Sequence, residues 1–192
     1  YQWASYETYE SVNEVTASST GVFLQEKYVT ERWVLRAGGR LNDTSHSYET
    51  VAGQRPDTAD KSWDSQLWSA GARFDAMEHL AFYGNIGSSF LAPSAKSVVG
   101  TIAAADAGVT GRNGQLPNPA LGPEKGIGSD LGFEYRTETG FAFGMRAFYN
   151  RIDDAIVDNV VSQLPSQSQS VNAGRARSQG FEVTLDHTAN AS

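Results

Sequence analysis

The chain has 192 residues, 40% of them hydrophobic, and its 22 acidic and 15 basic side chains give a net charge of −7. The sequence contains no run of Lys and Arg, so we expect no nucleic-acid partner, because phosphate binding needs concentrated positive charge. The lack of cysteine excludes disulfide scaffolds, thiolate zinc sites and cysteine nucleophiles. No apolar run reaches the roughly 18 residues of a transmembrane helix, but a membrane β-strand needs only about 9 to 11 residues.

Two strand pairs are predicted in the first half of the chain. Strand-like runs at 21–29 and 33–43 are separated by only three residues. Runs at 63–75 and 80–89 form a second pair, and apolar side chains alternate along both. Because a period of two places alternate side chains on opposite faces, these segments are predicted to be strands.

The clearest alternation lies at 124–150, on both sides of a turn at 137–140. A short loop with Gly140 in the left-handed conformation would make a tight hairpin there. A last strand is predicted at 170–186, which gives seven strands in all. If Thr137 pairs with Phe141, one apolar face of the hairpin contains the pairs Leu131 with Ala147, Phe133 with Met145 and Tyr135 with Phe143.

The connections between the predicted strands alternate in length. Three of them have three or four residues, whereas those at 44–61, 90–123 and 161–169 are longer. Short turns at one end and long loops at the other are typical of an outer-membrane barrel. Aromatic residues flank the short turns, as in an interfacial girdle: Trp33, Phe74, Tyr135 and Phe141. A plain porin-type barrel and a secreted, glycan-binding β-sandwich remain alternatives.

Five motifs in sequence order resemble those of TonB-dependent outer-membrane receptors. The first spans the hairpin at 21–43 and ends in Gly39-Arg40-Leu41-Asn42-Asp43. The second, Phe90-Leu91-Ala92-Pro93, is similar to a Phe-Arg-Ala-Pro box, with Leu91 in place of the usual Arg. The third, Asn118-Pro119-Ala120-Leu121-Gly122-Pro123-Glu124, resembles an Asn-Pro-x-Leu-x-Pro-Glu box. The last two are at 148–156 and 172–182.

This resemblance implies an all-β fold, an antiparallel meander that forms part of a transmembrane barrel of about 22 strands. Residues 1–192 would be one section of the barrel domain, without the plug domain and the final strands. The family resemblance further implies a bacterial outer-membrane location, contact with lipid, no enzymatic activity and no cofactor. The ligand would be a bulky, scarce nutrient, most often a ferric siderophore, and TonB would energise uptake through the plug.

The resemblance and the alternation together give candidate site residues. Six motif residues are expected to have mainly structural roles: Phe90, Pro93, Asn118, Pro119, Pro123 and Glu124. Six polar residues on the alternate face are expected to line the lumen: Arg36, Arg40, Asp130, Glu134, Arg146 and Glu182. The connection at 90–123, rich in small residues, is expected to be mobile and to contact ligand. The three histidines are scattered, so no metal site is predicted.

Overall fold

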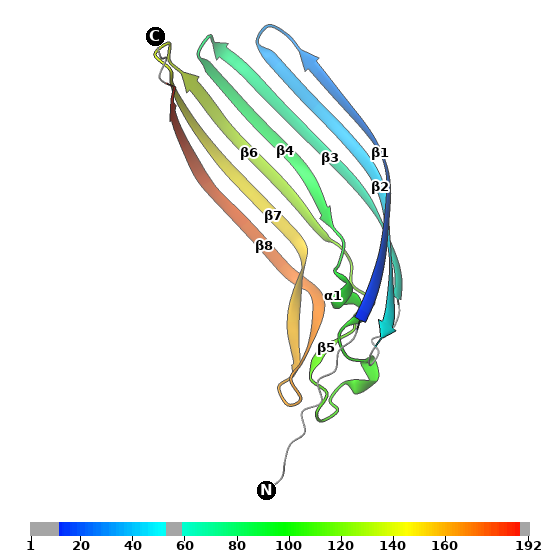
Figure 1. The fold of residues 1–192 in the computed structure, drawn as a ribbon. Coiled ribbons are helices and arrows are strands. Elements are labelled where there is room, and N and C mark those ends of the chain that lie inside the picture. The colour runs from blue at the N-terminus through cyan, green and yellow to red at the C-terminus, as the bar shows by residue number, and fades with distance from the viewer. Residues whose placement is uncertain (1–11, 53–58, 189–192) are drawn as a thin grey trace.

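A computed structural model describes residues 12–52 and 59–188. Within them, long strands form one curved sheet (Figure 1). These strands are β1 (Val12–Val29), β2 (Trp33–Ala52), β3 (Ala59–Met77), β4 (Leu80–Leu91), β6 (Glu124–Arg136), β7 (Phe141–Ser162) and β8 (Gln167–His187). The connection from β4 to β6 contains α1 (Ala95–Val99), the 3-10 turn η1 (Ala104–Asp106) and the short strand β5 (Gly114–Leu116). No helix of the described segments is long and apolar enough to cross a membrane.

The seven long strands confirm the predicted antiparallel meander. They lie in the order β1-β2-β3-β4-β6-β7-β8, with every neighbouring pair antiparallel. The predicted hairpin register is also correct, since Phe133 lies opposite Met145 and Tyr135 opposite Phe143. The backbone N–H of Thr137 donates to the Phe141 carbonyl at 2.8 Å, and Gly140 has a φ of 86°. Strand β5, which the sequence did not predict, pairs in parallel with β8.

Two of the three predicted long loops are wrong. Strand β2 continues to Ala52 and β3 begins at Ala59, so most of 44–61 is paired strand. Strands β7 and β8 likewise extend through most of 161–169, leaving 163–166 as a turn. Polar residues continue these strands beyond the apolar alternation, and backbone pairing does not require apolar side chains. The connection from β4 to β6 is the long irregular segment of the described chain.

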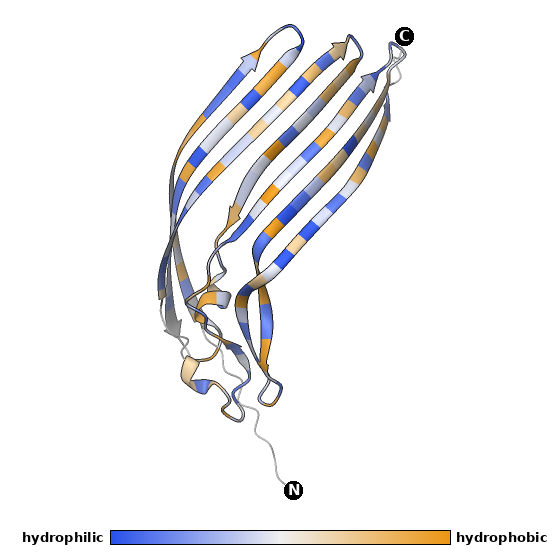
Figure 2. Ribbon diagram, turned by 180° about the vertical axis from the view of Figure 1, so that it is seen from behind, coloured by the Kyte–Doolittle hydropathy of each residue, from blue (hydrophilic) through white to orange (hydrophobic). Residues whose placement is uncertain are grey.

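The two faces of the sheet differ in polarity, and Figure 2 shows the two colours alternating along the long strands. We call one side the apolar face and the other the polar face. Side chains of the apolar face are not packed into a core: Leu131 is 68% exposed and Phe181 73% exposed. At the short turns this face contains the ring contact of Trp33 with Phe74, at 4.5 Å between centroids. Such a surface needs an apolar environment outside the described chain.

A small buried core lies at the opposite end of the strands. Tyr48 of β2 packs with Val98 and Val99 at the end of α1, and all three are at most 2% exposed. The connection from β4 to β6 thus reaches β2 on one side, while its strand β5 pairs with β8 on the other. Figure 1 shows this connection between the lower parts of β2 and β8, where it spans the curved sheet.

Candidate functional site

The six predicted lumen-facing residues all lie on the polar face. Strand register places Arg36 and Arg40 there on β2, two residues on β6, one on β7 and one on β8. The β6 to β8 members are Asp130, Glu134, Arg146 and Glu182. The structure therefore brings the predicted set onto one surface. That this surface faces a lumen stays a prediction.

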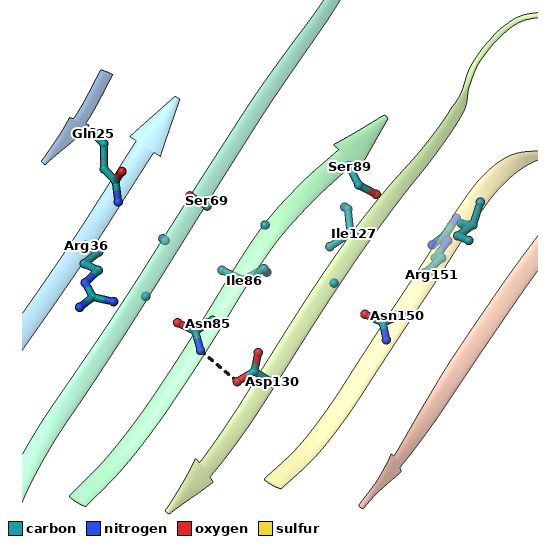
Figure 3. A pocket seen from close by; sticks show the side chains of 15 residues that line it. Gln25, Arg36, Ser69, Asn85, Ile86, Ser89, Ile127, Asp130, Asn150 and Arg151 are labelled. Carbon is teal, nitrogen blue, oxygen red and sulfur yellow. Dashed lines mark hydrogen bonds between the residues drawn. The ribbon is translucent and has the colours of Figure 1, made fainter. Parts of the chain in front are cut away.

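Three of the six residues form an ion-pair chain across β6, β7 and β8. Arg146 lies between the two carboxylates, with Nη2 at 3.6 Å from Asp130 Oδ1 and Nη1 at 3.3 Å from Glu182 Oε2. On the other side, Asn85 Nδ2 donates to Asp130 Oδ2 at 3.0 Å (Figure 3). The charges of the polar face are thus partly neutralised by one another, which leaves a hydrated surface of mixed charge.

A second charged group lies nearer the short turns and includes two residues, Arg73 and Asp75, that were not among the predicted ones. Arg73 Nη1 donates to Glu134 Oε2 at 3.1 Å, and its Nε donates to Asp75 Oδ1 at 3.0 Å. All three side chains are 42% to 44% exposed, so each ion pair contributes little to stability. The alternation along β3 could have identified Arg73 and Asp75. Both lie on the same side of β3 as Gly71, which is opposite Arg36 on the polar face.

A hollow of about 690 Å³ lies in the polar face beside the first of these groups, and Asp130 and Asn85 are among its lining residues. Figure 3 shows Arg36, Asn85, Asp130 and Asn150 around it, each from a different strand. Gly71 leaves room for the amide of Asn85, because a Cβ at this position would lie 2.5 Å from Asn85 Oδ1. The hollow offers amide, guanidinium and carboxylate groups, so it can bind a polar partner.

The connection from β4 to β6 is tightly tied to the wall, which does not fit the expected mobile loop. Gln167, 2% exposed, donates from Nε2 to the carbonyls of Asp106 at 2.8 Å and Arg112 at 2.7 Å. Its Oε1 accepts from the Gly108 N–H at 2.8 Å. Gln115 of β5 donates to Asp158 Oδ1 at 3.0 Å. These partners are more than 40 residues apart, so no local sequence pattern could have revealed them.

The connection is also anchored to β2. The Tyr48 hydroxyl donates to the Pro93 carbonyl at 3.3 Å and lies 2.9 Å from His46 Nδ1. Burial raises the pKa of Tyr48 above its usual value. Ser94, directly after Pro93, caps α1 by accepting from the Ser97 N–H at 3.2 Å. Pro93 of the second motif is thus hydrogen-bonded to β2 just after the chain leaves β4.

The third motif lies where the chain re-enters the wall, and two of its side chains bind other segments. Asn118 Nδ2 donates to the Ser170 carbonyl at 2.8 Å, and its Oδ1 accepts from the Ala120 N–H at 3.1 Å. Glu124 Oε1 accepts from the Ile156 N–H at 2.6 Å. Pro119 lies exposed in the turn, whereas Phe90 and Pro123 are half-buried at the strand ends. The structural role assigned to the six motif residues stays a prediction, and these contacts are of the kind it requires.

The last three motifs meet at a β-bulge in β7. Asp154 has a φ of 57°, which interrupts the pairing of β7 with β8. The Asp154 carbonyl accepts from Asn172 Nδ2 at 2.8 Å, and the neighbouring Ile156 N–H is bound by Glu124. Residues from three separated motifs thus satisfy one irregular stretch of backbone. A β-bulge bends the strand that contains it.

The three histidines lie far apart in the fold. His46 contacts Trp63, with ring centroids 5.3 Å apart, on the extended part of the sheet. His79 is in a short turn, and His187 stacks on Phe141 at 4.1 Å. In the segments that the structure describes, no group of three or more His, Asp or Glu side chains could hold a metal ion.

Comparison with known proteins identifies the family. The sequence model described as "TonB dependent receptor-like, beta-barrel" matches residues 2–191. The chain belongs to this family. Its members are transporters and not enzymes, and membership excludes the plain porin. All strands within residues 12–52 and 59–188 belong to one sheet, which does not fit the two packed sheets of a β-sandwich. A comparison with curated proteins found no match.

Solved structures of such receptors have the same fold. The hemophore receptor HasR of Serratia marcescens, solved as a double mutant with its hemophore HasA and heme, matches with a TM-score of 0.72 at 16% identity, over 90% of this chain and 32% of HasR. The FrpB iron transporter of Neisseria meningitidis (F3-3 variant) gives 0.65 at 19% identity, over 95% and 25%. The siderophore receptor PirA of Pseudomonas aeruginosa gives 0.58 at 18%, over 91% and 40%. The chain therefore spans well under half the length of each.

Proposed function

We propose that this chain is a section of the barrel wall of an outer-membrane receptor that takes up a ferric siderophore. The observation that carries the proposal is the difference between the two faces of one curved sheet. A hydrophilic, hollowed face with an ordered connection across it suits a ligand passage, and the opposite apolar face suits lipid. The names of the similar structures, which include an iron transporter and a siderophore receptor, support an iron-containing ligand.

The apolar face supports insertion in the outer membrane. Along β7, apolar side chains occupy alternate positions from Phe141 to Tyr149, and charged residues follow at Arg151 and Asp153. This band of nine residues matches the roughly 9 to 11 residues that a tilted strand needs to cross a bilayer. The short turns with their aromatic neighbours would then lie at the periplasmic side. The connection from β4 to β6 would lie at the extracellular mouth.

The polar face would meet a plug domain, and TonB would act on that plug from the inner membrane. Mixed charges such as Arg146 with its two carboxylates suit a hydrated contact that must loosen when the plug rearranges. Ligand contact is assigned to the connection at 92–123 and to the part of the polar face that lies farthest from the short turns. The mechanism is binding followed by a conformational step, without covalent chemistry.

The proposal is tested with the complete receptor that contains this chain, in the source bacterium. The outer-membrane fraction is run on a gel with and without boiling. Uptake of radiolabelled iron, supplied as complexes with the siderophores that the bacterium uses, is measured in cells with and without the gene. We expect a heat-shifted band in the outer membrane and loss of uptake of one ferric chelate in the deletion strain. A band confined to the soluble fraction would overturn the membrane location. Unchanged iron uptake with lost uptake of labelled cobalamin would overturn the siderophore assignment.

A further inference from the structure

Four basic side chains gather on the apolar face, at the end away from the short turns. We call them the basic rim cluster: Lys125 of β6, Arg151 of β7, and Arg175 and Arg177 of β8. Register brings them together, because Arg151 lies opposite both Ile127 and Arg177, and Asp153 lies opposite both Lys125 and Arg175. In the sequence Lys125 and Arg151 are 26 residues apart, and Arg151 and Arg175 are 24 residues apart. The cluster is therefore not visible as a basic run in the sequence.

The cluster has an excess of positive charge. Its one acidic neighbour, Asp153, accepts from Arg151 Nη2 at 2.8 Å and from Arg175 Nε at 3.0 Å. Within residues 12–52 and 59–188, the side chains of Lys125 and Arg177 take part in no hydrogen bond or ion pair. Arg151 and Arg177 are directly opposed on adjacent strands, an arrangement that is unfavourable unless an anion lies between them. All four basic residues are exposed.

The position of the cluster indicates which anion it meets. Tyr149, two residues before Arg151 on the same face, ends the apolar band, and tyrosine is enriched where a membrane meets water. Phe90 lies directly opposite Lys125 on the neighbouring strand. A basic cluster immediately beyond the lipid-facing band lies at headgroup depth. Strand register places its residues on the face opposite the polar face, and Arg151, at the edge of the hollow in Figure 3, is the one member that also borders that hollow.

We propose that the basic rim cluster binds the phosphate groups of lipid headgroups in the outer leaflet. This inference rests on the proposed membrane insertion. Guanidinium groups bind phosphate through paired hydrogen bonds, and two opposed arginines on adjacent strands can share one phosphate. Asp153 holds Arg151 and Arg175 in place without neutralising the cluster. On β2 and β3 the same face has Asp43 opposite Asp64, so phosphate binding is confined to β6–β8.

The test uses the complete receptor in nanodiscs of phosphatidylcholine alone, with added phosphatidic acid, or with added oleate. The double variant Arg151→Gln/Arg177→Gln removes two positive charges from the cluster, and Arg32→Gln, which removes one positive charge at a short turn on the opposite end of the strands, is the control. Lipid retained by the purified receptor is counted by native mass spectrometry. Wild type and Arg32→Gln are expected to retain phosphatidic acid, and the double variant to bind it about 30-fold more weakly.

The remaining arms separate the possible failures. Equal retention of oleate and phosphatidic acid would overturn phosphate recognition in favour of general charge attraction. If inorganic phosphate stabilised the receptor against thermal unfolding to the same extent as phosphatidic acid does, the lipid assignment would be overturned. Equal retention by wild type and the double variant, both running as heat-shifted barrels, would overturn the site but not the membrane location. A wild-type receptor that enters no nanodisc would instead overturn the proposed function.

Discussion

The wall and the connection at 92–123 are stabilised in different ways. The wall is a continuous backbone ladder whose side chains face two environments, and large apolar residues such as Leu131 remain exposed. The connection is held by a few buried amide side chains, including Gln167 and Gln115, which bind backbone and side-chain groups of distant segments. The wall should therefore be sensitive to which face a substitution is on. The connection should be sensitive to the loss of single hydrogen bonds.

The largest effect is expected from a charge in the middle of the apolar band. Leu131→Arg should destabilise the complete receptor by about 2–4 kcal/mol, because an arginine at this depth must leave water for lipid. Thr184→Arg is the matched control, since Thr184 lies on the polar face between Glu182 and Asp186. Unfolding by urea in lipid vesicles measures both. Equal losses would contradict the assignment of the faces.

A smaller but local effect is expected from Gln167→Ala. The change removes the acceptor of the Gly108 N–H and the donor of two hydrogen bonds, to the carbonyls of Asp106 and Arg112, and lowers the free energy of opening the connection by about 2–3 kcal/mol. Amide exchange at Gly108 should accelerate while exchange in β6 stays unchanged. Gln163→Ala, four residues earlier and exposed, is the control. If β6 exchanged faster too, the connection and the wall would form one cooperative unit.

The same contrast explains what could be predicted from the sequence. The hairpin around Gly140 was predicted to the residue pair, because period-two alternation and turn chemistry are local signals. The extensions of β2 and β7 were missed because their polar residues lack alternation. Strand β5 and the Gln167 contacts were missed because they depend on residues far apart in sequence. Arg73 was accessible from alternation but had no motif to draw attention to it.

The link between the wall and the connection can be tested at Glu124. Glu124→Ala removes the acceptor of the Ile156 N–H beside the bulge and should cost about 1–2 kcal/mol locally. Glu124→Gln keeps an oxygen at this position and should retain most of the stability. Amide exchange at Ile156 measures both variants. If Glu124→Gln were as damaging as Glu124→Ala, the charge of Glu124 and not its hydrogen bond would be what matters.

The smallest effect is expected at the β2 anchor. Tyr48→Phe keeps the packing against Val98 and removes the hydrogen bonds of the hydroxyl, at a cost of about 0.5–1.5 kcal/mol. Because burial raises the pKa of Tyr48 above its usual 10.0, the wild-type anchor is fully stable below pH 10 and weakens as the pH rises through the folded-state pKa. Proteolysis of the connection should therefore increase at alkaline pH in wild type and not in Tyr48→Phe. An identical alkaline increase in both would assign the transition to another group, since only the wild-type anchor contains an ionisable hydroxyl.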